Sequence, residues 1–282
     1  MLVTLEELLT EARAGQYAVP AFNCTEDVMV RTILETAEAH RAPVILMCLD
    51  MHLKGNGWVY LAGLIKMAAE HHSIPVVLHL DHAYDPDLIR AAVHNGFSSV
   101  MIDGSKLPLD ENVQLTRSIV DMAHPRGVSV EGELGHVGGM DLQDVECAES
   151  VLTEPDEVSR FVEGTDVDAL AVSIGTSHGV YRSLPNLNIQ RLRELNAASA
   201  VPLVLHGGSG TPDEQIRQAV RNGICKINIF ADQRLAMFRG LRKSAEQKRP
   251  DPLPQQLFGP IRENLEAVVA EKIKLLGAEN RA

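Results

Sequence analysis

The stretch IPVVLHLDH, residues 74–82, indicates the fold class. It is a continuous apolar run that ends in imidazole and carboxylate side chains, a pattern typical of a strand covered on both faces in a parallel sheet. Similar runs follow one another at a mean step of about 30 residues, the length of one strand–helix unit. The expected strands are YAVPAFN (17–23), PVILM (43–47), IPVVLHLDH (74–82), SSVMIDG (98–104), VSVEGELG (128–135), ALAVSIGTSHG (169–179), VPLVLHGGSG (201–210) and CKINIFAD (225–232).

Helical patterns fill most of the gaps between these strands, and several of them end in glycine, a helix stop signal. The clearest patterns cover residues 28–41, 58–72, 85–96, 111–127 and 211–223. Eight strands that alternate with helices predict an α/β protein with the (β/α)8 TIM-barrel fold. An open doubly wound sheet is the structural alternative. Because no linker or low-complexity tract divides residues 1–282, we expect a single domain with a helical tail from about residue 250.

The charge and composition of the chain argue against some classes of binding partner. The chain of 282 residues carries 38 acidic and 26 basic side chains, a formal net charge of −12. This charge repels phosphate backbones and anionic lipid, so we expect no nucleic-acid or membrane partner. No apolar run approaches the roughly 20 residues that span a bilayer, and the first residues lack a signal-peptide pattern. The four cysteines are scattered. We therefore expect a cytoplasmic protein without a disulfide scaffold.

Three histidines stand where expected strands end, namely His82, His178 and His206. In a barrel the carboxyl ends of the strands meet at one face, where catalytic groups lie. Three imidazoles with an open fourth position form a catalytic zinc site. The alternative is that each imidazole bonds to backbone at a strand end. The alternation of side chains along a strand sets a condition on His82. In a regular strand His79 and Asp81 share one face and His82 lies on the other, so His82 reaches the cavity only if the strand ends near Asp81.

Carboxylates also occupy expected strands. Asp103 and Glu133 end two of them, and Glu131 lies on the same strand face as Glu133. Charged groups in such strands are costly unless they are paired or bound to metal. These side chains therefore belong to a buried ion pair, to a shell of residues that supports the metal ligands, or to an alternative position for the metal.

Two loops have functional patterns. HGGSG (206–210) leads from a strand into a helix, and backbone N–H groups of such a turn can cradle a phosphate. Asn228 and the segment after it follow the next strand, at the usual phosphate site of a barrel. The polar stretch MDLQDVECAESVLTEP (140–155) is long for a connection, so we expect a loop that closes over substrate.

Together the motifs closely resemble those of the class II, zinc-dependent ketose-bisphosphate aldolases of the shorter fructose- and tagatose-bisphosphate type. The resemblance covers nearly the whole chain. It is carried, in order, by AFN (21–23), VVLHLDH (76–82), VMIDGS (100–105), VEGELGHVGG (130–139), SIGTSHGVY (173–181), LHGGSG (205–210) and KIN (226–228).

The resemblance implies Zn²⁺ on His82, His178 and His206, with a monovalent cation as a further candidate ion. It implies that Asp81 is the acid/base, and that Asp141 is a mobile carboxylate that removes a proton from dihydroxyacetone phosphate. Asp103 and Glu133 match carboxylates near the metal. The implied substrate-binding residues are Asn23, Gly179, Gly207, Gly208, Ser209, Asn228, Ile229, Phe230 and Ala231. A small phosphorylated sugar is the expected substrate, and a homo-dimer or homo-tetramer the expected assembly.

Three positions depart from the family pattern. CLDMH (48–52) replaces a small polar segment and supplies no arginine for a distal phosphate, Ala231 replaces a threonine, and Asp141 replaces a glutamate. We expect an aldolase that cleaves a ketose 1,6-bisphosphate of the fructose or tagatose type to dihydroxyacetone phosphate and an aldehyde. The alternatives are an aldolase for a ketose 1-phosphate without the distal phosphate, a metal-dependent barrel hydrolase, and a catalytically silent sugar-phosphate binder.

Overall fold

The computed structural model describes residues 1–138, 150–179, 184–246 and 250–282. Its strands form a closed parallel barrel in chain order, so the predicted (β/α)8 fold is confirmed. The open-sheet alternative fails because β1 and β8 pair directly, with Ala21 opposite Asn228. The strands are β1 (Val19–Asn23), β2 (Val44–Leu49), β3 (Val76–Ala83), β4 (Ser99–Ile102), β5 (Ser129–Leu134), β6 (Ala169–Val172), β7 (Leu203–Leu205) and β8 (Ile224–Ile229).

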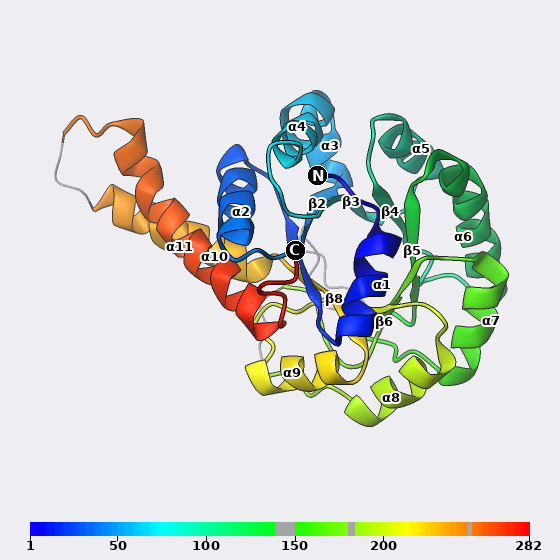
Figure 1. The fold of residues 1–282 in the computed structure, drawn as a ribbon. Helices are drawn as coiled ribbons and strands as arrows, with labels where there is room; N and C mark the ends of the chain where they lie inside the picture. The colour runs from blue at the N-terminus through cyan, green and yellow to red at the C-terminus, as the bar shows by residue number, and fades with distance from the viewer. Residues whose placement is uncertain (139–149, 180–183, 247–249) are drawn as a thin grey trace.

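Helices surround the barrel and bury the outer faces of its strands (Figure 1). Apolar residues recur at helical spacing in the longer helices, and the apolar face of such a helix packs against strands or against a neighbouring helix. The helices are α1 (Leu5–Gly15), α2 (Asp27–Ala39), α3 (Asp50–Leu53), η1 (Trp58–Gly63), α4 (Leu64–Ala69), α5 (Pro86–His94), α6 (Leu109–Ala123), η2 (His124–Arg126), α7 (Pro155–Thr165), α8 (Ile189–Ala198), α9 (Asp213–Arg221), α10 (Ala231–Ala245) and α11 (Pro254–Leu275).

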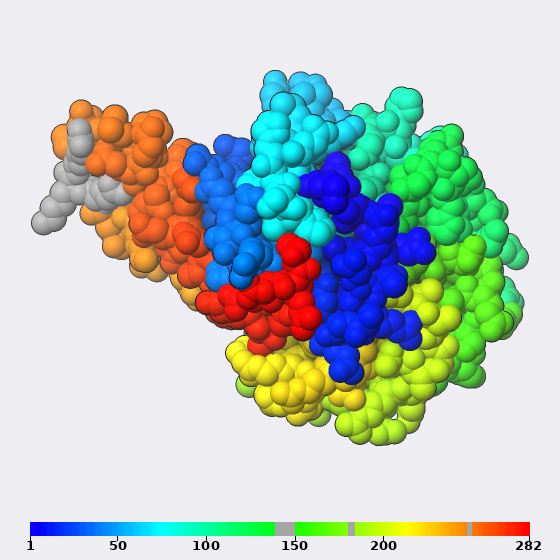
Figure 2. Space-filling model, in the orientation of Figure 1, coloured from blue at the N-terminus to red at the C-terminus, as the bar shows by residue number. Residues whose placement is uncertain are grey.

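The two ends of the chain pack at one end of the barrel. Helix α1 contacts β1, β5, β6 and β8, and so covers the amino ends of the strands. The last residues lie against α2, where the Asn280 amide donates to the His40 carbonyl at 3.0 Å. Figure 2 shows this face, with the N-terminal residues in blue beside the C-terminal residues in red. The carboxyl ends of the strands, at the opposite face, are left for the candidate site.

Helices α10 and α11 lie side by side and extend beyond the barrel (Figures 1 and 2). Helix α11 also packs against α2, and it buries Ile261, Leu265, Val269 and Ile273. The helical tail expected from about residue 250 is therefore present as α11. Among the described residues, no helix is long and apolar enough to cross a membrane.

An irregularity in β3 decides where His82 points. Leu80 pairs with Val100 and Ala83 with Ile102, so β3 carries one more residue than β4 over this span. His82 has φ +47°, in the left-handed region that residues with a Cβ seldom adopt. The condition that the strand must end near Asp81 was wrong, because β3 continues to Ala83. The extra residue turns His82 toward the cavity instead.

Candidate metal centre and active site

Three imidazoles converge at the carboxyl face of the barrel. The ring centroid of His82 lies 5.0 Å from that of His178 and 4.6 Å from that of His206. One ring nitrogen from each comes within 4.8 Å of the others. His206 follows β7 directly, whereas His178 lies in the loop after β6, which ends earlier than expected. The structure thus brings together the three predicted histidines.

The donor atoms of these rings fit a metal ion. The buried atoms His82 Nε2 and His206 Nδ1 have no hydrogen-bond partner in the described part of the chain. Such unpaired buried nitrogens are costly unless something binds them. Since a neutral imidazole offers one lone pair, nitrogens directed at a common point suit a divalent cation with nitrogen ligands.

Two carboxylates adjoin the same centre. His82 Nδ1 donates to Asp103 Oδ2 at 3.0 Å, and Ser105 holds the other Asp103 oxygen through its amide and hydroxyl. Glu133 Oε2 lies 3.5 Å from His206 Nδ1. His82, Asp103 and Glu133 also form a group with ligand atoms within 4.8 Å. The two carboxylates therefore adjoin the imidazole cluster, and together with His82 they could hold a metal ion.

Electrostatics at this centre favour one positive charge, on His82. Burial opposes a charge on His82, but the Asp81, Asp103 and Glu133 carboxylates outweigh it and raise the pKa of His82 to about 10. Burial and the neighbouring charges at His82 and His206 lower the pKa of His178 to about 3. Burial likewise raises the pKa of Glu133 well above its ordinary value. A bound cation would supply the positive charge that these carboxylates otherwise draw onto His82.

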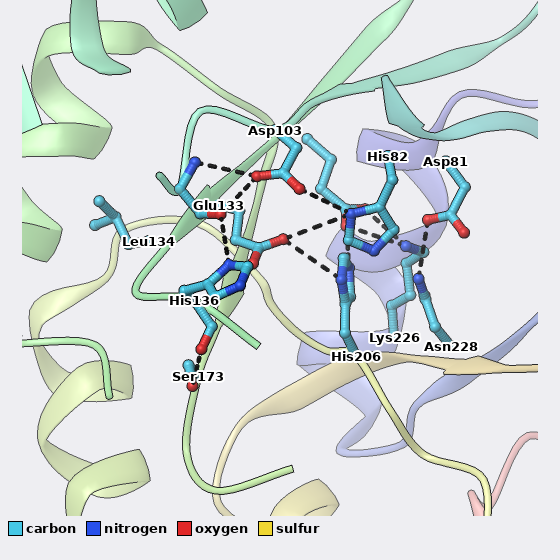
Figure 3. A network of polar contacts seen from close by, with 12 residues as sticks. Asp81, His82, Asp103, Glu133, Leu134, His136, Ser173, His206, Lys226 and Asn228 are labelled. Atoms are coloured by element: carbon cyan, nitrogen blue, oxygen red, sulfur yellow. Dashed lines mark hydrogen bonds and ion pairs between the residues drawn. The ribbon is translucent and has the colours of Figure 1, made fainter. Parts of the chain in front are cut away.

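Asp81 is held from two sides by amide groups. Its Oδ2 accepts from Asn23 Nδ2 at 2.8 Å. Its Oδ1 accepts from Asn228 Nδ2 at 3.1 Å, a bond drawn in Figure 3. Burial opposes ionisation, but His82 and Lys226 keep the pKa of Asp81 below its ordinary value. The carboxylate is thus ionised and oriented beside the imidazoles. Asn23 and Asn228, predicted to bind substrate, contact Asp81 here and also line the cavity.

The predicted phosphate-binding residues lie mostly at the same cavity. Gly179, Gly207, Ser209, Asn228, Phe230 and Ala231 line it. Gly208 instead connects β7 with β8, since its amide donates to the Asn228 carbonyl at 3.0 Å. Ile229 is a core residue at 1% exposure. These two positions are not brought into the cavity, because the backbone there is used in barrel packing.

The cavity, of about 270 Å³, has further lining residues. Leu49 at the end of β2, with Asp50 and Met51 in α3, belongs to the 48–52 segment that departs from the family pattern. The lining residues that sequence reasoning did not single out follow α3, β3, β4 and β5 or lie on α10: Lys54, Tyr84, Lys106, His136, Val137 and Arg234. Their place directly after predicted strands was the available signal. Asp141 and most of the loop expected to close over substrate lie outside the described residues. The described ends of that loop are joined by paired backbone bonds of 2.8 Å between His136 and Val151.

Sequence comparison decides the family. The family model described as "Fructose-bisphosphate aldolase class-II" matches residues 3–281. The chain belongs to the class II fructose-bisphosphate aldolase family. The aldolase is 39% identical to the fructose-bisphosphate aldolase of Giardia intestinalis, over 100% of this chain and 94% of that protein. It is therefore a carbon–carbon lyase, not the hydrolase that three histidines alone would also permit.

Solved structures of similar proteins agree with the fold of this aldolase. The crystal structure of the YdjI aldolase from Escherichia coli K12 matches with a TM-score of 0.89 at 32% identity, over 100% of both chains. The structure of a putative fructose-1,6-bisphosphate aldolase from Coccidioides immitis matches with a TM-score of 0.87 at 28% identity, over 98% of this chain and 97% of that one.

Ser209 joins the glycine-rich turn to α10 in this aldolase. Its Oγ accepts from the amides of Phe230, at 3.1 Å, and Asp232, at 3.2 Å. Ser209→Ala should lower the free energy of unfolding by about 1 kcal/mol, because amides at a helix start lose their acceptor. Chemical denaturation measures this change. Ser118→Ala, on the exposed side of α6, is the control and should change stability by less than about 0.5 kcal/mol. Equal losses in the two variants would contradict the prediction.

Proposed function

We propose that this aldolase binds Zn²⁺ through His82, His178 and His206, and reversibly cleaves a fructose- or tagatose-type 1,6-bisphosphate to dihydroxyacetone phosphate and an aldehyde. The observation that carries this proposal is the set of three converging imidazoles beside the ionised Asp81. The imidazole donor set favours zinc over the harder cations Mg²⁺ and Ca²⁺, which prefer oxygen ligands. Asp103 and Glu133 are the proposed alternative ligands for the same ion.

The residues of the site account for the steps of cleavage. A divalent cation on the imidazoles would polarise the ketone oxygen of the ketose. Asp81 accepts the proton of the C4 hydroxyl while the C3–C4 bond breaks, the electron pair stays on C3, and C4 becomes the aldehyde carbon. Asn23 and Asn228 keep both Asp81 oxygens in place. In the reverse direction Asp81 returns the same proton. Asp141 is the candidate for exchanging the proton on C3.

The phosphate on C1 would bind at the turn after β7. Gly207 and Ser209 line the cavity there, together with Phe230 and Ala231 at the start of α10. Backbone amides at a helix start attract an anion. Lys54 and Lys106 line the cavity from loops after β2 and β4, across the barrel from this turn. Their charges support a second phosphate on the distal end of the substrate, even though the segment after β2 has no arginine.

The cellular setting belongs to the proposal as well. Among the described residues Cys24, Cys48 and Cys225 are buried free thiols, as suits the reducing cytoplasm. Several large apolar side chains are exposed on the projecting helices, including Phe238 and Leu241 on α10 and Phe258 on α11. Exposed apolar surface of this kind supports a homo-oligomer.

Product analysis tests the substrate. The purified aldolase would be assayed with fructose 1,6-bisphosphate, tagatose 1,6-bisphosphate and the matching 1-phosphates, and dihydroxyacetone phosphate would be quantified. We expect a bisphosphate to have the highest kcat/KM, because Lys54 and Lys106 can pair with the distal phosphate. Equal or higher kcat/KM for a 1-phosphate would instead favour the alternative substrate without the distal phosphate. Absence of dihydroxyacetone phosphate from every reaction would contradict the proposal as a whole.

Metal removal tests the cofactor. A chelator should abolish cleavage and added Zn²⁺ should restore it, because the imidazoles alone cannot polarise the ketone. His206→Ala should lose bound zinc, as measured by elemental analysis of the purified protein. The matched control is His94→Ala on α5, outside the candidate site, which should retain zinc. Full turnover by a preparation shown to be free of metal would exclude the zinc assignment.

Asp81→Asn tests the acid/base. The variant should keep its zinc and lose about 10²–10⁴-fold in kcat, the usual range for removal of a general acid or base. Asp50→Asn removes another cavity carboxylate that has no assigned chemical role, and it should stay within several-fold of wild type. Near-normal kcat in zinc-loaded Asp81→Asn would show that another group carries the proton.

A further inference from the structure

A buried charged cluster lies one layer deeper in the barrel than the candidate metal centre. Glu131 precedes Glu133 by two positions on β5, and Lys226 precedes Asn228 by two on β8. Both are 0% exposed. Lys226 Nζ lies 2.8 Å from Glu131 Oε2 and 3.1 Å from Glu131 Oε1. The lysine therefore contacts both oxygens of one carboxylate, and it lies beside His206 in Figure 3.

This ion pair occupies space that other barrels fill with apolar side chains. Burying two charges costs several kcal/mol per ion, and apolar replacements of similar volume are often neutral or stabilising. Stability alone therefore gives no reason for Glu131 and Lys226 at these positions. Their contacts with neighbouring groups must supply one.

The contact that stands out is with His206. Its Nε2 lies 3.0 Å from Glu131 Oε1, a hydrogen-bond distance. Lys226 donates to both Glu131 oxygens, so the carboxyl group acts as an acceptor here. The hydrogen shared with Glu131 is then on His206 Nε2, and the lone pair of the neutral ring is on Nδ1. Nδ1 is the His206 atom that lacks a partner among the described residues and lies 3.5 Å from Glu133 Oε2. The deeper cluster thus determines which nitrogen of His206 faces the centre.

His79 is close to the same carboxylate but bonds elsewhere. Its Nε2 lies 3.7 Å from Glu131 Oε2, beyond hydrogen-bond distance, and its Nδ1 lies 2.8 Å from Ser99 Oγ. His206 is therefore the imidazole that Glu131 orients. Lys226 keeps Glu131 from rotating away, since it holds both carboxylate oxygens.

We propose that Glu131 and Lys226 are positioning residues for the metal centre: the pair fixes the tautomer and the orientation of His206, so that Nδ1 is presented to the ion. The proposal rests on His206 being a metal ligand, as proposed above. Hydrogen bonds of this kind to a ligating histidine typically change metal affinity by 10–100-fold. The pair needs no contact with substrate to act in this way.

Two double variants separate the hydrogen bond from the ion pair. Glu131→Leu with Lys226→Met removes both charges and the acceptor, and so leaves no unpaired buried charge. Glu131→Gln with Lys226→Met also removes both charges but keeps a carbonyl oxygen that can accept from His206 Nε2. Affinity of each metal-free protein for Co²⁺ would be measured from the visible absorption of the bound ion, which reports the ligand geometry without any assay of turnover.

We expect the Leu/Met variant to bind Co²⁺ about 10–100-fold more weakly than wild type, and the Gln/Met variant to recover most of that loss. Asp168→Asn is the control for destabilisation, because it removes another largely buried carboxylate, which bonds to His124 and the Val130 amide. It should leave Co²⁺ affinity unchanged. Wild-type affinity in the Leu/Met variant would overturn the proposal, as would an equal loss in both double variants.

Co²⁺ binding by His206→Ala distinguishes a failure of the metal assignment from a failure of the positioning role alone. If His206→Ala binds Co²⁺ with wild-type affinity, the metal assignment itself fails. If it loses Co²⁺ while the Leu/Met variant does not, only the positioning role fails. Imidazole ¹⁵N spectra of metal-free wild-type protein, assigned with His206→Gln, supply a test even if a double variant does not fold. They should show His206 with its proton on Nε2, and a proton on Nδ1 would overturn the proposal.

Discussion

The pairing of β1 with β8 is the constraint on which the rest of the structure depends. It closes the sheet, with Val19 opposite Lys226 and Ala21 opposite Asn228. Closure makes the carboxyl ends of all strands converge on one space. Loops and side chains that are far apart in the chain therefore lie together in that space. Asn23 at the end of β1 and Asn228 on β8 can both contact Asp81 of β3 only because the sheet is closed.

Convergence also concentrates charge where water is scarce. Asp81, Asp103, Glu131 and Glu133 are all buried, and buried carboxylates require positive partners. The structure supplies them in two layers, Lys226 in the deeper one and His82 above. Lys226 bonds directly only to Glu131 and acts on Asp81 from a distance, so the neighbouring positive charge of the upper carboxylates comes mainly from His82. The same electrostatics that make the centre costly to bury make it suited to bind a metal.

The imidazoles of His82 and His206 are held in place in two different ways, one by a local irregularity of the backbone and the other by a long-range hydrogen bond. The left-handed conformation of His82 costs about 1–3 kcal/mol, a strain that persists only where surrounding structure determines it. The extra residue in β3 and the bond to Asp103 provide that restraint. His206 is restrained differently, by a carboxylate from β5. His82 and His206 are therefore each oriented by a carboxylate from another part of the barrel, which restrains both imidazoles.

The sequence by itself determined the periodic features of this aldolase. Apolar runs, helical spacing and the placement of His82, His178 and His206 sufficed to predict the barrel and the convergence of these residues, and the motifs sufficed for the family. Only the tertiary structure decided that β3 continues past Asp81 with an extra residue and that Ile229 is a core residue. It also decided that Asn23 and Asn228 bond to Asp81, and that Glu131 pairs with Lys226. Spacing along one strand reports its own alternation, whereas these features depend on register between strands and on contacts between residues far apart in the chain, which exist only once the barrel closes.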